Sequence, residues 1–572
     1  MTTATPHTTG YHSQFPHDPR IADYLRAQRI IGPDETPRDM VDRIVAVLAA
    51  AERDLTGPRT AARFSTDLGT ALDQRKIVFS TPIMTNAGRH PDRPLAACAV
   101  PPVDLRGDLA HVKHIVDSYH QAGMGTGFNL DDLDDPVTVL RYLNGVAVAG
   151  ADSGAEDRPV GNMALLALAH PRAGEFIDCK VGADGRGERW KFNISLTVTD
   201  EQMRAAAAGT GRAAELLHAA AEAAHACADP GLVFADRMAA GNPTPNIGPL
   251  VSTAPCAEVG LAAGETCQFG YLNLAAFHRP NRSAVPVDLD ALAATTRTLV
   301  RALDNAIEAS LSRYPHAASA RIMRAKRKIG VGICGLADLL LAAGIPYGSA
   351  QARRLAQEVI GYVNYISKHA SAELARERGA CLALLGQQSR YADPGFLGRF
   401  ARLDLTSAPP DVWTRLARSV ADTGLLRNTS TVALPPTGRS SPIIEASTGI
   451  EPLFRLTTPL GRAHPAVLDS LAAHPEAQDH VAHTGHLPDR YPLPSDLRAL
   501  LATATQIPAA QHLAMAAAVQ ACVDEAVSKT VNLPATATPA EVHDIFVNAW
   551  EAGCKGATVY RDTSRTLQPK AL

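Results

Sequence analysis

The sequence predicts an α/β fold, in which strands separated by helices form a sheet or a barrel. Short apolar runs such as VGICGLADLLLA (331–342) and TVALP (431–435) alternate with the Ala-rich segments 202–226 and 291–310. Short apolar runs favour buried strands and Ala-rich segments favour helices, so this alternation is typical of α/β proteins. The chain has 572 residues, of which 20% are charged and 46% hydrophobic, enough for one large domain or several small ones. It shows no repeat of fixed period.

The N-terminal part is predicted to be helical. Residues 1–19 are polar and are expected to form a disordered tail. The next residues predict a short helix, a turn at Gly32-Pro33, and a longer amphipathic helix with Thr36 as its N-cap and Pro37 in its first turn. We therefore divide the chain into a tail (1–19), a helical N-terminal region (20–70) and one α/β domain (71–572).

The C-terminal part is predicted to end in a helix and a strand. Segment 460–500 is rich in His, Pro and Asp, and we expect it to be a surface excursion. An Ala-rich helix and the strand-like run KTVNLP (529–534) follow it.

Composition and charge exclude several classes of protein. The formal net charge is -3, which argues against DNA or RNA as a partner, because binding phosphates needs a basic excess. No apolar stretch approaches the roughly 20 residues of a membrane-spanning helix. The first residues lack the apolar core of a signal peptide. We expect a cytoplasmic protein that does not bind membranes.

Nine cysteines are scattered along the chain, at positions 98, 179, 227, 256, 267, 334, 381, 522 and 554. This spacing does not indicate a framework of structural disulfides. No two of them form a C-x-x-C pair, so a zinc site has no support and no metal is expected. Four lie among apolar residues and are expected to pack in the core: Cys227, Cys334, Cys381 and Cys522.

Three glycine-containing motifs are candidate ligand sites. Residues 330–335 match G-x-G-x-x-G, but the preceding RIMRAKRKI (321–329) is a poor buried strand, so a scaffold role is favoured over dinucleotide binding. The alternate glycines of 123–127 allow either close approach to a flat ligand or a tight turn. Residues 434–441 suit a phosphate site, with backbone N–H groups and Arg439 as donors, or an ordinary loop with a Ser cap.

Taken together, thirteen stretches resemble the large catalytic subunit of ribonucleotide reductases, closest to the cobalamin-dependent class. They occur in family order over almost the whole chain: FSTPIMTNAG (79–88), CAVPPV (98–103), GMGTGFN (123–129), EFIDCK (175–180), FNISLTVTDEQM (192–203), NPTPNIG (242–248), STAPCAEV (252–259), ETCQFGYLNLAAF (265–277), RALDNAIEAS (301–310), KIGVGICGLADLL (328–340), RNTSTVALPPTGRSSPIIEASTGIEPLF (427–454), VSKTVNLP (527–534) and GCKGATVYRDTSR (553–565). No single stretch would suffice, but their order makes the resemblance specific.

The resemblance implies a ten-stranded α/β barrel of two parallel five-stranded halves, with a finger loop through its centre. Cys256 at the tip of that loop would be the thiyl radical that abstracts the ribose 3′ hydrogen. Glu258 would be the general base on the 3′-OH. Cys98 and Cys267 would be the reducing pair, which becomes a redox-active disulfide in each turnover.

The resemblance also implies a set of substrate-binding residues. The glycine run, with Gly125 and Gly127, would line the nucleotide pocket, with Thr81 near the phosphates. The phosphates would be bound by the loop residues Thr437, Gly438, Arg439, Ser440 and Ser441.

The radical source follows by exclusion among the family's classes. The metal-dependent class passes the radical through two adjacent tyrosines, whereas Thr558-Val559-Tyr560 contains one. The glycyl-radical class needs a C-terminal glycine loop, and TSRTLQPKAL (563–572) contains no glycine. Adenosylcobalamin is therefore the expected cofactor.

Four departures from the family pattern distinguish this chain. Position 254 is Ala where the family has an Asn that hydrogen-bonds the ribose, a loss that can cost several powers of ten in rate. The segment LDDLDD (130–135) is acidic where the family binds an effector triphosphate, which its aspartates would repel. We also expect no N-terminal ATP-binding domain and no C-terminal cysteine tail, so the disulfide would be reduced by an external dithiol such as thioredoxin.

We therefore expect a specialised enzyme that reduces a single ribonucleotide to its 2′-deoxyribonucleotide without allosteric control, as a monomer or homodimer. One alternative is a redox-neutral radical modification or epimerisation of a nucleotide ribose. The other is a catalytically inactive nucleotide-binding paralogue. Retention of all four catalytic candidates, Cys98, Cys256, Glu258 and Cys267, argues against that alternative.

Overall fold

The computed structural model describes residues 11–154, 160–280, 285–387 and 389–565. Its centre is a 10-stranded sheet built from two sets of parallel strands. The first set contains β2 (Cys98–Ala99), β3 (Gly125–Asn129), β4 (Asn162–Ala167), β5 (Phe192–Val198) and β6 (Gly231–Phe234). The second contains β9 (Thr266–Asn273), β10 (Ile329–Cys334), β11 (Thr530–Leu533) and β12 (Gly556–Arg561). β1 (Ile77–Phe79) pairs antiparallel with β9.

Isolated bridges close this sheet into a barrel. Val331 of β10 pairs parallel with Val432, and Leu434 pairs parallel with Val527 just before β11. The segment 432–434 is thus the fifth member of the second set. The two sets meet at antiparallel seams, between β2 and β9 and between β6 and β12. The predicted barrel of two parallel five-stranded halves is confirmed.

A small hairpin lies within the barrel, formed by β7 (Ser252–Thr253) and β8 (Gly260–Leu261). Its turn carries Cys256 and contacts strands of both halves, as described below. The G-x-G-x-x-G motif has the expected scaffold role, because it forms β10 itself. A Cβ atom at Gly330 would lie 2.2 Å from the Phe269 ring, which leaves no room for a larger residue.

The N-terminal region is helical as predicted, with α1 (Pro19–Ala27), α2 (Pro37–Thr56) and α3 (Pro58–Asp73). Thr36 caps α2 in a reciprocal capping box with Asp39. The prediction of a disordered tail over residues 1–19 is wrong for its second half. Residues 11–18 pack against the helices: Phe15 is 2% exposed, and the Ser13 hydroxyl donates to Asp73 on α3 at 2.6 Å. Residues 1–10 lie outside the described residues.

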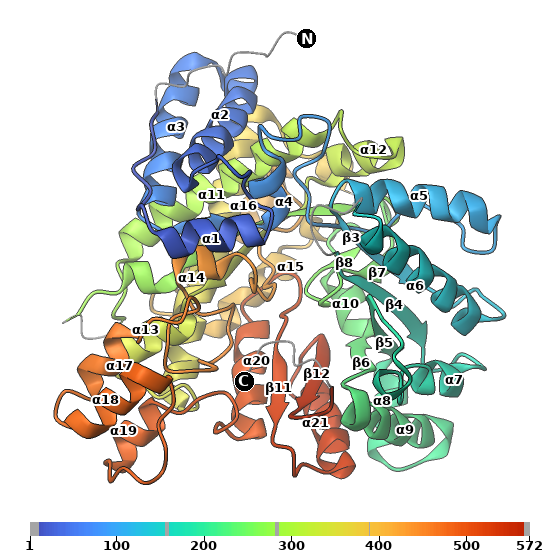
Figure 1. The fold of residues 1–572 in the computed structure, drawn as a ribbon. Coiled ribbons are helices and arrows are strands. Elements are labelled where there is room, and N and C mark those ends of the chain that lie inside the picture. The colour runs from blue at the N-terminus through green and yellow to red at the C-terminus, as the bar shows by residue number, and fades with distance from the viewer. Residues whose placement is uncertain (1–10, 155–159, 281–284, 388, 566–572) are drawn as a thin grey trace.

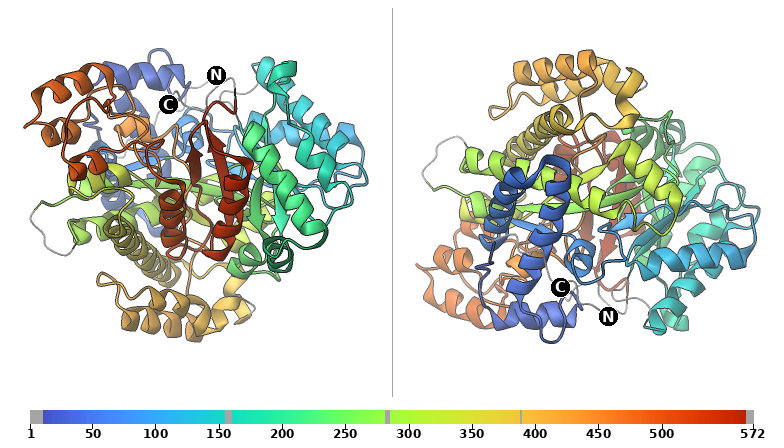
Figure 2. Two further views of the ribbon diagram at one scale, coloured as in Figure 1. Left: turned by 90° about the horizontal axis from the view of Figure 1, so that it is seen from below. Right: turned by 90° about the horizontal axis from the view of Figure 1, so that it is seen from above.

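Helices surround the barrel on all sides (Figures 1 and 2). Those beside the first half are α5 (Leu109–Gln121), α6 (Pro136–Asp152), α7 (Ala173–Asp178), α8 (Asp200–Ala207), α9 (Gly211–Cys227) and α10 (Ala235–Gly241). The remaining helices are α4 (Thr81–Asn86), α11 (Leu289–Ser310), α12 (Ala317–Lys326), α13 (Leu336–Ala342), α14 (Ala350–Arg378), α15 (Pro394–Gly398), α16 (Pro410–Thr423), α17 (Pro465–Ser470), α18 (Pro475–Thr484), α19 (Ser495–Leu500), α20 (Ala509–Gln520) and α21 (Pro539–Glu551).

Most predicted helices are confirmed, with one correction. The Ala-rich segment 202–226 is two helices, because Gly209 and Gly211 adopt left-handed backbone conformations with φ of 68° and 66°. The excursion 460–500 contains the short helices α17–α19, which lie at the periphery in Figure 1.

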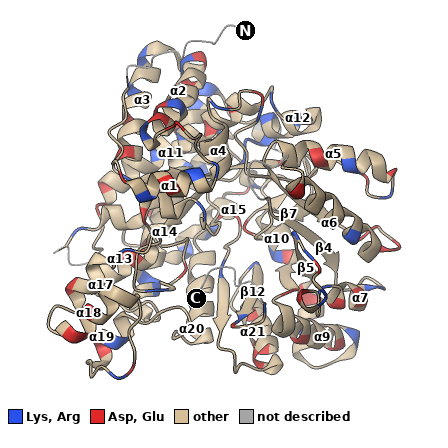
Figure 3. Ribbon diagram, in the orientation of Figure 1, with Lys and Arg blue, Asp and Glu red and all other residues tan. Residues whose placement is uncertain are grey.

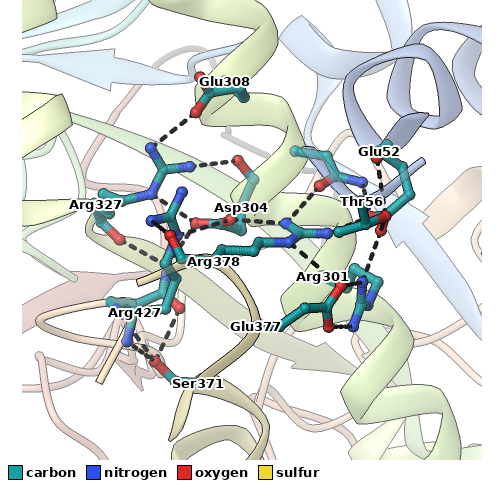
Figure 4. Close-up of polar contacts among 12 residues, drawn as sticks. Glu52, Thr56, Arg301, Asp304, Glu308, Arg327, Ser371, Glu377, Arg378 and Arg427 are labelled. Atoms are coloured by element: carbon teal, nitrogen blue, oxygen red, sulfur yellow. Dashed lines mark hydrogen bonds and ion pairs between the residues drawn. The ribbon is translucent and has the colours of Figure 1, made fainter. Parts of the chain in front are cut away.

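A buried ionic network ties the N-terminal helices to the barrel (Figure 4). Asp304 on α11 pairs with Arg327 at 2.8 Å, Arg378 at 2.9 Å and Arg427 at 3.3 Å. Glu52 on α2 also pairs with Arg378. Burial alone would raise the pKa of Asp304, but the three guanidinium groups have the larger effect and lower it. The carboxylate therefore stays ionised.

Acidic and basic residues are interspersed along the ribbon in the view of Figure 3. Among the described residues, no helix has the length and apolar character needed to cross a membrane.

Candidate active site

The turn of the β7–β8 hairpin presents Cys256 at its tip. The Ala254 N–H donates to the Val259 carbonyl at 3.0 Å, and the Ala257 N–H donates to the Ala254 carbonyl at 2.9 Å. Ala257 adopts a left-handed conformation with φ of 60°, which reverses the chain directly after Cys256. The hairpin therefore holds one defined turn, which fits the predicted finger loop.

Both halves of the barrel hold this turn. From the first half, the Asn193 side chain donates to the Pro255 carbonyl at 2.8 Å, and the Phe128 carbonyl accepts from the Ser252 hydroxyl at 3.0 Å. From the second half, the Ala526 N–H donates to the Glu258 carbonyl at 2.9 Å. These contacts fix the tip in the interior of the barrel.

The glycine run 123–127 makes room for the hairpin. A Cβ atom at Gly125 would lie 3.0 Å from Pro255 Cγ, and one at Gly127 would lie 2.1 Å from the Thr253 carbonyl oxygen. Neither glycine lines the cavity at Cys256, where we expected both to contact the nucleotide. The structure instead supports close approach of another part of the chain as the reason for these glycines.

Cys256 opens on a cavity of about 380 Å³. The cavity is bordered by the amino ends of β4, β5 and β6, by β11 and β12, and by the loop that follows segment 432–434. The residues that line it are Met163, Asn193, Ile194, Ser195, Ala228, Asp229, Gly231, Pro255, Cys256, Ala257, Pro436, Gly438, Thr448, Glu451, Phe454, Ser528, Lys529, Thr530, Asn532, Thr558, Val559, Tyr560 and Arg565. Cys256 is exposed to this cavity but surrounded by the barrel, and this burial raises the pKa of its thiol well above the ordinary value.

Cys98 and Cys267 lie directly opposite each other across the antiparallel seam between β2 and β9. Neither is in a disulfide in this structure; Cys98 is 9% exposed and Cys267 is fully buried. The Cys98 thiol is close enough to interact electrostatically with both Cys256 and Cys267. The register thus brings the two cysteines of the expected reducing pair together beside the loop tip.

Glu258 is buried close to Cys256, and one of its carboxyl oxygens has no hydrogen-bond partner. Burial raises the pKa of Glu258 to about 7, although the backbone N–H groups of Glu258 and Cys256 lower it in part. A carboxyl group with this pKa can exchange protons at neutral pH, which is the property required of a general base.

The loop 437–441 reaches the cavity only through Gly438. The Thr437 hydroxyl accepts from the Gly449 N–H at 2.9 Å, while Ser440 and Ser441 are buried. The Arg439 side chain turns away to Gln28, at 2.5 Å and 2.9 Å, and the Arg439 carbonyl accepts from the Tyr24 hydroxyl. The expected contact of Arg439 with phosphate therefore does not match this geometry. Thr81 is a buried residue at the start of α4 and does not line the cavity.

Several cavity residues escaped sequence reasoning. Lys529 donates to Glu451 and, at 2.8 Å, to Nδ1 of His512, which has a pKa lowered to about 3 by burial and by Lys529. Asn193 and Arg565 also face the cavity. The four that line the cavity, Asn193, Glu451, Lys529 and Arg565, lie within the motifs FNISLTVTDEQM, STGIEPLF, VSKTVNLP and VYRDTSR, but a motif does not reveal which side chains face a cavity.

Comparison with known proteins identifies the family. Residues 207–560 match the family described as ribonucleotide reductase, barrel domain. A vitamin B12-dependent ribonucleoside-diphosphate reductase of Mycobacterium tuberculosis (strain CDC 1551 / Oshkosh) is 35% identical over 579 residues, covering 94% of this chain and 77% of that protein. The chain belongs to the ribonucleotide reductase family. The predicted membership is confirmed, and the protein is an oxidoreductase of the ribonucleotide reductase type.

More distant members agree with this assignment. A vitamin B12-dependent ribonucleoside-diphosphate reductase of Thermoplasma acidophilum is 29% identical over 536 residues, covering 86% of this chain and 64% of that protein. The structure of an Actinobacillus ureae class Id ribonucleotide reductase alpha subunit superposes with a TM-score of 0.75 at 18% identity, covering 96% of this chain and 97% of that one. At this identity the superposition shows the shared fold.

Among the described residues, no group of three or more His, Cys, Asp or Glu side chains has the arrangement of a metal site.

Proposed function

We propose that this protein is an adenosylcobalamin-dependent reductase that converts a ribonucleotide to its 2′-deoxyribonucleotide by thiyl-radical chemistry at Cys256. The observation that carries the proposal is the position of Cys256. Its thiol opens on a cavity from the tip of a rigid loop, beside two cysteines that face each other across a strand seam. The vitamin B12 dependence in the relatives' names supports the cofactor.

The residues around Cys256 fit a large cofactor. Asn193 and Arg565 border both the cavity at Cys256 and a second cavity of about 380 Å³. The second cavity adds Trp190 and Lys191, so the walls combine an aromatic face with hydrogen-bond donors for the amide groups around a corrin ring. Asn193, Lys191 and Arg565 would hold adenosylcobalamin. When bound, the cofactor supplies the radical by homolysis of its cobalt–carbon bond.

The chain's own residues would carry the reaction on the ribose. The Cys256 thiyl removes the 3′ hydrogen and returns it at the end of turnover. Glu258 accepts the 3′-OH proton, which helps the protonated 2′-OH leave as water. Cys98 and Cys267 supply two protons and two electrons, and their sulfur atoms join in a disulfide. The sum is ribonucleotide plus dithiol giving deoxyribonucleotide, disulfide and water, and an external dithiol such as thioredoxin restores the pair.

We further propose a single preferred substrate without effector control. Position 254 is a fully buried Ala, so it offers no amide to the ribose. Of the acidic segment 130–135, the Asp131 carboxylate accepts from the Ala167 N–H and Asp135 caps α6, so both are engaged within the protein. Neither carboxylate suits an anionic triphosphate.

The test is a product screen with purified protein, adenosylcobalamin and dithiothreitol, in the dark and without oxygen. Ribonucleoside mono-, di- and triphosphates of each common base are incubated singly, and the diphosphates are tested first because the relatives are named for them. The masses of the products are measured by mass spectrometry. We expect one base to yield a product lighter by one oxygen, at a rate that deoxynucleoside triphosphates do not change. Effector-dependent reduction of all four bases would contradict the single-substrate proposal. A product of unchanged oxygen content would contradict reduction itself.

A further inference from the structure

Three consecutive cations precede β10, and all three are buried. The RIMRAKRKI segment is too basic to be a buried strand, yet Lys326, Arg327 and Lys328 are 0%, 3% and 1% exposed. Each finds its own carboxylate partners, because the chain leaves α12 here and turns into β10. Arg327 pairs with Asp304 in the network of Figure 4. Lys326 and Lys328 both pair with Glu265.

Lys328 links the finger hairpin to the strand of the reducing pair. Its ammonium donates to the Gly260 carbonyl of β8 at 2.6 Å and lies 3.1 Å from Glu525 and 3.4 Å from Glu265. Glu265 immediately precedes β9 and also pairs with Lys326 at 2.8 Å. Burial opposes the charge on Lys328, but the two glutamates outweigh it and raise the pKa of its ammonium. Lys328 is therefore a permanent cation at this position.

This cation acts on Cys267. A Cβ atom at Gly330 would lie 3.3 Å from the Cys267 sulfur, so that sulfur faces β10, the strand that Lys328 precedes. Burial raises the pKa of the Cys267 thiol well above its ordinary value. Lys328 is the neighbouring group that lowers it, against Cys98, Glu525 and Glu258, which raise it. A thiolate at Cys267 is thus stabilised by one specific residue.

Cys98 is the more accessible of the two cysteines. It is 9% exposed, whereas Cys267 is 0% exposed, and its thiol interacts with Cys256 at the loop tip. A thiol reagent from solvent therefore reaches Cys98 more readily than Cys267. In disulfide exchange the sulfur that is reached is attacked, and the sulfur better able to bear negative charge leaves.

We propose that re-reduction of the Cys98–Cys267 disulfide has a fixed order, in which the reductant attacks Cys98 and Lys328 stabilises Cys267 as the leaving thiolate. This inference rests on the reducing pair of the proposed function and makes Lys328 a positioning residue. A reductant thiolate forms a bond to the Cys98 sulfur as the disulfide breaks, and the electron pair goes to Cys267. The second thiol of the reductant, as thiolate, then attacks the reductant's sulfur in the mixed disulfide. The reductant becomes a disulfide, and the Cys98 and Cys267 thiolates each take up a proton.

The test traps the first step with a reagent that cannot complete the second. The full-length protein is oxidised with diamide, treated briefly with the monothiol β-mercaptoethanol, quenched with acid, alkylated and digested. Mass spectrometry then locates the mercaptoethanol adduct. We expect an excess of at least about tenfold on Cys98 over Cys267. An equal distribution, or an excess on Cys267, would overturn the proposed order.

Variants of the two lysines test the role of Lys328. Lys328→Met should slow re-reduction by dithiothreitol on the order of tenfold and shift the adduct toward Cys267, and Lys328→Arg should restore both. Lys326→Met is the matched control, because it also removes a buried partner of Glu265 but is not among the groups that act on Cys267. Wild-type rate and adduct distribution in Lys328→Met would overturn the role of Lys328. If that variant does not fold, the wild-type adduct distribution still decides the order.

Failure of the Cys98–Cys267 disulfide to form would contradict more than the exchange order. If diamide forms no disulfide between Cys98 and Cys267, both the exchange order and the reducing pair of the proposed function are wrong. An adduct on Cys267 would overturn the order alone.

Discussion

Glu258 shows at the scale of one residue how burial prepares a group for chemistry. It lies two positions after Cys256 on a tight turn, and one carboxyl oxygen is buried without a partner. No basic residue is among the groups that set its protonation, so burial raises the pKa to about 7. An isolated carboxylate of this kind is a poor structural element and a good proton acceptor.

This pKa predicts the pH dependence of turnover. Only the ionised carboxylate can accept the 3′-OH proton, so kcat/KM should rise with pH up to a plateau above about 7. Glu258→Gln should lower kcat on the order of a hundredfold to a thousandfold and remove this rise. The measurement is deoxynucleotide formation in buffers spanning about two pH units on either side of neutrality. A rise that persists unchanged in the variant would exclude Glu258 as the base.

At this scale, sequence reasoning selects residues by the chemistry that restricts their type. The resemblance selected Cys98, Cys256, Glu258 and Cys267, and the structure brings these four together. It failed for Arg439, which contacts Gln28 from α1, because the direction of a loop side chain depends on tertiary packing. Such packing has no signature in a local motif.

At the scale of elements, β3 and the finger hairpin are matched in shape. The backbone of Thr253 occupies the space that a side chain at Gly127 would need. The position of the hairpin therefore requires a residue without a Cβ atom at position 127. The alternate glycines predicted either close approach to a flat ligand or a tight turn. The neighbour is instead another part of the chain, which only the structure reveals.

Gly127→Ala should therefore displace the hairpin while the barrel remains folded. A shift of about 1 Å at the radical thiol is expected to lower kcat on the order of a hundredfold. Gly145→Ala in α6 is the matched control, because a Cβ atom there meets nothing within 4 Å and should leave activity unchanged. Both variants are compared by circular dichroism and by product formation. Full activity in Gly127→Ala would contradict the proposed dependence on loop position.

The Asp304 network predicts a stability effect between elements. Asp304→Asn leaves three buried arginines without their shared carboxylate and should lower the free energy of unfolding by about 3 kcal/mol. Asp411→Asn, at the exposed pair with Arg415 on α16, should have no measurable effect. Urea unfolding at neutral pH measures both.

The pH dependence of this effect has a defined sign. The folded protein lowers the pKa of Asp304, so its stabilising contribution is complete above the unfolded value of about 4 and is lost as the pH falls below it. The difference between wild type and Asp304→Asn should shrink in acid. A difference that stays constant from neutral pH down to about 3 would contradict an ionic origin.

At the scale of the whole molecule, the barrel brings together residues from both halves. Two parallel sets meet at antiparallel seams, and one seam places Cys98 opposite Cys267. The cavity combines the amino ends of β4, β5 and β6 with residues of β11 and β12. The alternation of strands and helices predicted an α/β fold, but the order of the strands came from the family resemblance. Closure through the bridges at Val432 and Leu434 appears only in the structure.

The measurement that tests the central claim most directly is release of tritium from 5′-tritiated adenosylcobalamin. Wild-type protein, Cys256→Ser and the control Cys554→Ala are each incubated with the preferred nucleotide in the dark and without oxygen. Reversible hydrogen transfer between cofactor and thiol carries tritium to the Cys256 thiol, from which it exchanges into water. We expect release with wild type and with Cys554→Ala, and none with Cys256→Ser. Release that persists in Cys256→Ser, or its absence in wild type with every nucleotide, would contradict radical chemistry at Cys256.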